Sequence, residues 1–133
     1  MTPILLVHGA WHGAWCWYKA IPALEAAGFE PHTLDLPGHG LRAGETQSLA
    51  AYADAVAERL AEIGRPAVLL GHSMGGQVIS AAAERVPERI SSLVYLCAFL
   101  PRAGESIFAN AAGNAEYVLG GYMTPLDDGG LVV

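Results

Sequence analysis

Four short strand-like segments alternate with segments of helical character, and this alternation constrains the fold more than any other feature of the chain. PILLVH, PAVLLG and SSLVYLCAFL are continuous apolar runs, typical of strands covered on both faces, and FEPHTLD alternates apolar with polar residues. Repeated strand–helix units predict a parallel α/β sheet with right-handed crossovers and helices on both faces. We expect strands near residues 3–8, 29–35, 66–71 and 92–98.

Local signals set the ends of these elements. Pro31 cannot donate a ladder hydrogen bond, which predicts that the second strand lies at an edge. Ser48 precedes a stripe of apolar residues spaced three and four apart, and Gly64 follows it, so a helix is expected between them. The other helices are expected from about Trp15 to Ala27, with the regular part beginning near Ile21, and from Ser73 to about Arg85.

Composition excludes several classes of protein. The 133 residues amount to one domain, and 53% of them are hydrophobic, which argues against disorder. Thirteen acidic residues against seven basic ones give a net charge of −6 with no basic cluster, so we expect no nucleic-acid partner. No apolar run approaches ~18 residues, which predicts no membrane span. The two cysteines lack metal-ligand spacing and suit a reducing cytoplasm; no metal or cofactor is expected.

The stretch GHSMG, residues 71–75, is a G-x-S-x-G between a predicted strand and a predicted helix. In that context the pattern is typical of a nucleophile elbow, a strained turn that lifts a serine hydroxyl above the sheet. Glycines are needed on both sides because the neighbouring backbone would collide with a side chain. Ser73 is therefore the predicted catalytic nucleophile.

A second glycine-rich turn, HGAW, ends the first strand at residues 8–11. The carboxyl ends of parallel strands lie at one edge, so this turn should lie beside the elbow. Acyl transfer needs two backbone N–H donors facing the carbonyl oxygen, and Met74 and Ala10 are the predicted pair. Trp11 is a candidate substrate-binding residue. We expect helix packing from Trp15 and Trp17, structural hydrogen bonds from His8 and His72, and a buried, inert thiol at Cys97.

Four longer stretches together resemble a known family: LVHGAWHGAWCWYKAIPALEAAGF, LDLPGHG, LLGHSMGGQV and LVYLCAFLPRAGES. They look like the α/β-hydrolase superfamily, and within it the plant-type methylesterase and hydroxynitrile-lyase group with its bacterial esterase relatives. The resemblance implies strand order 2-1-3-4, with Ser73 as nucleophile and Ala10 and Met74 as oxyanion-hole donors. The lyases carry threonine where this chain has Gly9, which favours a carboxylesterase acting on a small-molecule ester.

The chain also departs from that family. Family members continue through a cap, further strands, an acidic residue and a catalytic histidine. None of the five histidines here is a convincing base, and Asp127 and Asp128 lie where a cap should begin. We therefore expect residues 1–100 to be the N-terminal part of a hydrolase core, truncated after the fourth strand, and residues 101–133 to be the start of a cap.

Two alternatives stay open. The chain could be a catalytically inactive, truncated or ligand-binding remnant, or a hydroxynitrile-lyase-like enzyme, which Gly9 disfavours. In a truncated chain the fourth strand would present a long apolar edge, which predicts self-association through that edge.

Overall fold

The computed structural model describes residues 1–113, 124–125 and 131–132. The chain forms two compact units, Met1–Leu100 and Pro101–Val133. In the second unit, α4 (Ile107–Ala112) begins where the Ser106 hydroxyl accepts a hydrogen bond from the Ala109 N–H. The short strands β5 (Thr124–Pro125) and β6 (Leu131–Val132) pair antiparallel. That this unit begins a cap stays a prediction, and Asp127 and Asp128 lie outside the described residues.

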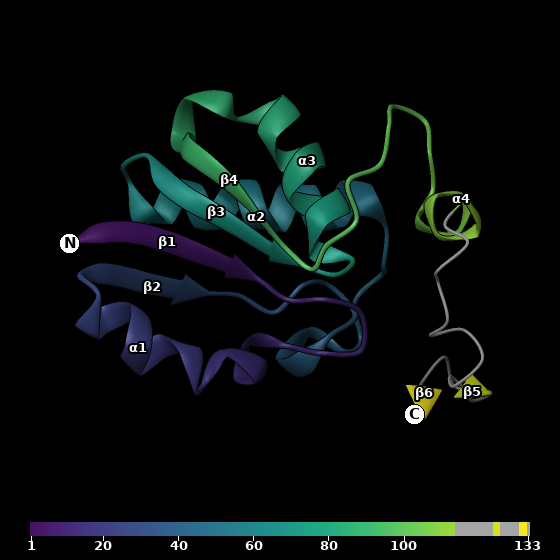
Figure 1. Cartoon of the computed structure of the whole chain (residues 1–133), viewed down its shortest axis with the longest axis horizontal. Helices are drawn as coiled ribbons and strands as arrows, with labels where there is room; N and C mark the ends of the chain where they lie inside the picture. The colour runs from purple at the N-terminus through teal and green to yellow at the C-terminus, as the bar shows by residue number, and fades with distance from the viewer. Residues whose placement is uncertain (114–123, 126–130, 133) are drawn as a thin grey trace. The chain divides into compact units, whose positions relative to one another are not determined.

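The first unit contains a parallel sheet of four strands in the order β2-β1-β3-β4 (Figure 1). This confirms the predicted fold class and strand order. Pro31 pairs with Ile4 on an edge strand, as predicted. The strands are β1 (Thr2–Val7), β2 (Phe29–Thr33), β3 (Ala67–His72) and β4 (Ile90–Leu96). The second and fourth strands end two residues earlier than predicted.

The predicted first helix is two separate pieces, a 3₁₀ turn η1 (Ala14–Trp17) and α1 (Ala20–Ala26). Pro22 lies in the first turn of α1, where its missing N–H costs no helical hydrogen bond. Gly28 follows α1 with a φ of +87°, the left-handed conformation that ends many helices.

The helix α2 (Leu49–Ile63) has the predicted bounds because its capping signals are local. The Ser48 hydroxyl accepts from the Ala51 N–H at 3.0 Å, and Gly64 ends the helix with a φ of +75°. The helix α3 (Gly75–Arg85) begins two residues later than predicted, since Ser73 itself is not helical. The remaining 3₁₀ turns are η2 (Gly40–Arg42) and η3 (Pro87–Arg89).

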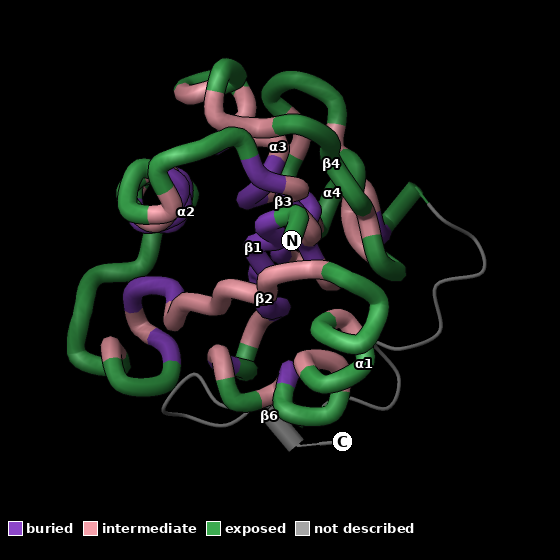
Figure 2. Tube along the Cα trace, turned by 90° about the vertical axis from the view of Figure 1, so that its left-hand side faces the viewer, coloured by how far each residue is buried: buried purple, intermediate pink, exposed green. Residues whose placement is uncertain are grey.

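Alternate residues of β1 supply two cores, one on each face of the sheet. Leu5 and Val7 pack with α2 and α3, whereas Ile4 and Leu6 pack with Trp17 and the apolar side of α1. Figure 2 shows buried residues along β1 and on one side of α2, whereas α1 contributes only partly buried side chains. Both faces of the sheet are therefore covered, as the continuous apolar runs predicted.

The strand β4 is the exception to this burial. It pairs with β3 alone among the described elements, and Leu93, Val94 and Leu96 are exposed on it. Across the described part of the chain, no helix combines the length and the apolar character that crossing a membrane requires.

Candidate functional site

The two glycine-rich turns lie at the same edge of the sheet, as predicted. Val7 pairs with Gly71, so the residues that follow β1 and β3 leave the sheet side by side. An ideal Cβ placed on Gly9 would lie 3.0 Å from the Ser73 Cβ. The first turn is therefore in van der Waals contact with the serine at the end of β3.

Ser73 has the backbone conformation of a strained turn. Its φ is +55°, a left-handed value that residues other than glycine rarely adopt and that costs conformational energy. A Cβ on Gly71 would overlap the Gly75 carbonyl, and a Cβ on Gly75 would lie 2.7 Å from the Val7 carbonyl oxygen. Close approach of backbone explains why both positions flanking the serine are glycines.

A third glycine, which sequence reasoning missed, fixes the elbow to the segment after β4. The Ser73 carbonyl accepts hydrogen bonds from the N–H groups of Gly76 (3.0 Å) and Phe99 (3.1 Å). A Cβ on Gly76 would overlap the Phe99 carbonyl. The pair of glycines at 75–76 was the only sequence signal for this close contact, because the segment that contains Phe99 lies more than 20 residues away in sequence.

His8 is fully buried at the start of the first turn, and both of its ring nitrogens are hydrogen-bonded. The Leu36 N–H donates to Nε2 at 3.1 Å, and Nδ1 lies 2.7 Å from the Gly9 carbonyl oxygen. Burial lowers the pKa of His8, as do the nearby rings of His39 and His12, against an opposing effect of Asp35 and of the Gly9 hydrogen bond. The hydrogen bonds predicted for His8 are confirmed.

Asp35 connects the start of η1, just after the first turn, to the Pro-Gly turn after β2. Oδ1 accepts from the Ala14 N–H at 2.7 Å, and Oδ2 accepts from the Leu41 N–H at 3.0 Å. Burial opposes ionisation of this carboxyl, but the two N–H donors and the neighbouring His8 and His39 outweigh it and lower its pKa. Sequence reasoning missed Asp35 as a site-supporting residue, although it lies inside the LDLPGHG stretch.

The aromatic residues around the first turn play different parts. Trp17 is buried at 7% exposure and packs in the core, as predicted, whereas Trp15 is 62% exposed and stacks on His12. The prediction that Trp15 packs within a helix is therefore wrong, because the 3₁₀ turn places the two tryptophans on different sides. Trp11 lies on the turn, half exposed, with a φ of +60°.

His72 precedes the elbow and is partly covered by aromatic rings. It meets Trp17 and His12 edge-on, with ring centroids 6.4 and 6.3 Å away. Burial lowers the pKa of His72, and the nearby His12 adds to the effect.

Cys97 differs from its prediction, since it is exposed rather than buried. It follows β4 by one residue and has a φ of +43°. Cys97 is exposed because β4 has one neighbouring strand among the described elements, which leaves little to cover a side chain at its end.

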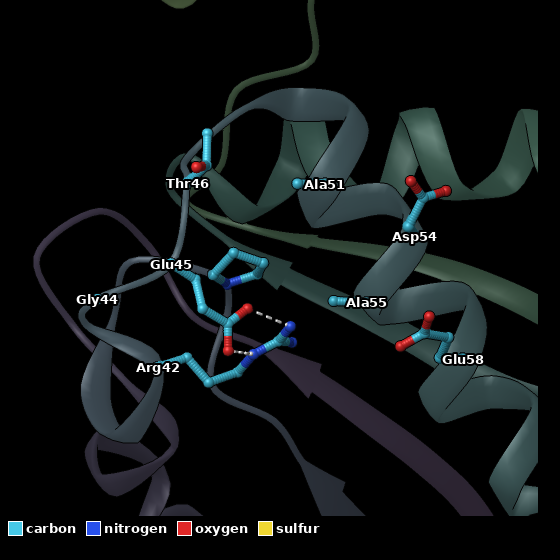
Figure 3. A pocket seen from close by; sticks show the side chains of 9 residues that line it. Arg42, Gly44, Glu45, Thr46, Ala51, Asp54, Ala55 and Glu58 are labelled. Atoms are coloured by element: carbon cyan, nitrogen blue, oxygen red, sulfur yellow. Dashed lines mark hydrogen bonds and ion pairs between the residues drawn. The ribbon is translucent and has the colours of Figure 1, made fainter.

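The structure also contains an open hollow of about 480 Å³ away from the serine turn (Figure 3). Glu45, Asp54 and Glu58 line it with Arg42, whose guanidinium binds Glu45 through two hydrogen bonds of 2.9 and 2.6 Å. No residue of either glycine-rich turn lines it. The three carboxylates are exposed, and Glu45 and Asp54 are paired with arginines. Within the described ranges, no group of three or more histidines, cysteines and carboxylates is placed to hold a metal ion.

These features define a class: α/β proteins with a serine in a strained strand-to-helix turn at the carboxyl edge of a parallel sheet. The chain belongs to the alpha/beta hydrolase family, whose family model matches residues 4–129.

Individual relatives agree with this assignment. The chain is 44% identical over 108 residues to the probable esterase PIR7A of Oryza sativa subsp. indica, covering 76% of this chain and 40% of that protein. It is 42% identical over 117 residues to the carbendazim hydrolyzing esterase of Nocardioides sp. (strain SG-4G), covering 82% and 47%. The crystal structure of the pyrethroid hydrolase PytH matches with a TM-score of 0.81 at 31% identity, covering 97% of this chain and 55% of that one. The chain thus spans less than half the length of these two curated relatives.

Proposed function

We propose that this chain carries the nucleophile half of a serine esterase with an acyl-enzyme mechanism, acting on a small-molecule ester. The observation that carries the proposal is Ser73 itself, in a left-handed turn between β3 and α3 and in contact with the Gly9 turn. The names of the relatives, several of which are esterases, support the reaction class.

In the proposed reaction the Ser73 Oγ attacks the ester carbonyl carbon while a base takes the hydroxyl proton. The carbonyl π electrons move to oxygen, and the N–H groups of Ala10 and Met74 stabilise that oxyanion. Collapse of the tetrahedral species breaks the bond to the alcohol, which leaves with a proton and gives an acyl-enzyme. Water then hydrolyses the acyl-enzyme by the same steps. Trp11, exposed on the turn, would contact the substrate. No cofactor or metal takes part.

The proposal assigns neither the general base nor its acidic partner to a described residue. His8 is unsuited because both of its ring nitrogens are already bonded. Each of these two relatives is more than twice as long as the stretch that matches this chain. We expect the base and the acid in the part of such a protein that the match does not cover. A cytoplasmic location stays a prediction from the two free cysteines.

The test is labelling by a serine-directed fluorophosphonate, read by intact mass and peptide mapping. We expect slow modification at Ser73, loss of labelling in Ser73→Ala, and no loss in Ser92→Ala, which removes an exposed hydroxyl on β4. An elbow with oxyanion donors but an incomplete triad retains roughly 10³-fold rate enhancement over water. No labelling at Ser73 would contradict the nucleophile assignment.

Hydrolysis of a nitrophenyl ester tests whether a base within this chain activates the Ser73 hydroxyl. We expect the chain and its Ser73→Ala variant to differ little in turnover, because no base activates the hydroxyl. Rapid turnover that depends on Ser73 would show that one of the five histidines acts as the base. Saturable ester binding without labelling or turnover would favour the ligand-binding alternative.

A further inference from the structure

The peptide group between Gly9 and Ala10 carries the proposed oxyanion donor, the Ala10 N–H. In a trans peptide the carbonyl oxygen and the N–H of the same plane point in opposite directions. The peptide bonds of the described residues are all trans. Whatever fixes the Gly9 carbonyl therefore also fixes the direction of the Ala10 N–H.

The His8 ring fixes that carbonyl. A backbone N–H can only donate, so the Leu36 N–H bond at 3.1 Å requires an unprotonated Nε2 on His8. In the neutral ring the proton then lies on Nδ1, which donates to the Gly9 carbonyl oxygen at 2.7 Å. The bond from Leu36, 28 residues away, thus selects the tautomer that holds the Gly9–Ala10 peptide.

The strand order brings the first turn between the segment that follows β2 and the elbow that follows β3. The strand β1 lies between β2 and β3, so the turn after β1 has the β2 side on one flank and the β3 side on the other. The His8 ring contacts Leu36 and His39, both in the segment that follows β2, with ring centroids of the two histidines 5.1 Å apart. His8 Nδ1 holds the Gly9 carbonyl at 2.7 Å, and Gly9 lies against the elbow, since an ideal Cβ on it would be 3.0 Å from the Ser73 Cβ.

The turn needs such a restraint because its backbone is easily rearranged. Glycine accepts conformations closed to other residues, so Gly9 itself sets little limit on the orientation of the peptide that follows it. Trp11 is in the left-handed region, and His12 Nδ1 lies 2.8 Å from the Ala10 carbonyl oxygen, which restrains the next peptide. Two successive carbonyls of this turn therefore contact histidine rings.

We propose that His8 is a positioning residue: through its Nδ1–H bond to the Gly9 carbonyl it aims the Ala10 N–H at the oxyanion, with Leu36 selecting the tautomer. This inference rests on the proposed function, and it assigns to His8 no proton transfer to substrate. His8 does not supply the oxyanion donor. It fixes, before the reaction, the direction in which the Ala10 N–H points.

Two variants separate the positioning role from a merely structural one. In His8→Asn the side-chain amide nitrogen lies near the place of Nδ1 and can donate to Gly9. In His8→Gln the longer amide can reach the Leu36 N–H but places no donor at Nδ1. Both lose one buried hydrogen bond, so we expect both to melt at lower temperature than the parent chain.

The phosphonylation rate of Ser73 should differ between them. Loss of an oxyanion donor slows catalysis roughly 10²–10³-fold, and a misdirected donor should cost the glutamine variant about 10–100-fold, whereas the asparagine variant should stay within about 3-fold of the parent chain. Equal rates in the two variants, with the parent chain labelled, would overturn the positioning role alone. Failure of the parent chain to label at Ser73 would overturn the proposed function.

A measurement on the unsubstituted chain does not depend on labelling or on the folding of variants. Nitrogen-15 spectra of the imidazole rings at neutral pH should show His8 neutral with its proton on Nδ1. A proton on Nε2 would overturn the inference whatever the labelling rates.

Discussion

The Asp35 carboxylate accepts a hydrogen bond from the backbone N–H of Ala14 at 2.7 Å, across 21 residues of sequence. Its other oxygen binds the Leu41 N–H, so one side chain joins the segment after β1 to the segment after β2. The segment after β1 is therefore held at two places, by His8 in the first turn and by Asp35 at the start of η1.

The substitution Asp35→Asn should loosen this connection. The amide nitrogen of the new side chain would face one of the two N–H donors, and hydrogen bonds to a charged acceptor contribute about 1.5–3 kcal/mol each. We expect a lower free energy of unfolding by about 1–3 kcal/mol and slower phosphonylation of Ser73. Chemical denaturation and the labelling assay measure the two effects. The control is Glu84→Gln, an exposed carboxylate on α3; an equal change in both variants would contradict the role of Asp35.

Position 71 requires glycine because a side chain would not fit there, not because the backbone needs the conformational freedom of glycine. Its φ is not in the left-handed region, yet a Cβ would overlap the Gly75 backbone. We expect Gly71→Ala to lower the free energy of unfolding by about 1–3 kcal/mol or more, as overpacking does, and to abolish Ser73 labelling. Gly44→Ala, where no atom lies within 4 Å, should change stability by less than about 0.5 kcal/mol. Similar thermal melts for the two variants would show that the elbow tolerates a side chain.

Stability should fall in mild acid because of His8. Its pKa in the folded chain is below the unfolded value of 6.5, so below that value the unfolded state binds more protons. The stabilisation is present in full above 6.5 and is lost as the pH falls from there toward the folded pKa. Protonated Nε2 would also face the Leu36 N–H donor to donor. Asp35, His39 and His12 are the titratable groups near enough to act on the ring.

Urea denaturation between about pH 5 and 8 measures this dependence, which for one proton can reach about 1.4 kcal/mol per pH unit. Burial lowers the pKa of His72 as well, so part of the slope should remain in His8→Asn. A slope unchanged by that substitution would assign the whole effect to other groups.

The exposed side of β4 should make the isolated chain self-associate. Leu93, Val94 and Leu96 lie exposed on a strand that has one neighbour among the described elements. Charged residues on an edge strand oppose strand pairing, so Val94→Lys should reduce the associated fraction in sedimentation velocity. Leu41→Lys, at a fully exposed position off the sheet, should have no such effect. A monodisperse monomer of the unsubstituted chain would contradict the prediction.

The elements and the serine turn followed from the sequence because their signals act over a few residues. Alternation of apolar runs and helical stripes set the parallel sheet, and Ser48 and Gly64 set the ends of α2 through hydrogen bonds and backbone conformations within one turn. The G-x-S-x-G pattern located Ser73 because a strand-to-helix turn is itself local.

Only the tertiary structure decided which distant groups meet at that turn. The bonds from Leu36 to His8, from Ala14 to Asp35 and from Phe99 to Ser73 each join segments more than 20 residues apart. The exposure of Trp15 and Cys97 depends on what the neighbouring elements leave uncovered. No local pattern records these contacts, because each depends on the register of strands that are far apart in the chain and adjacent in the sheet.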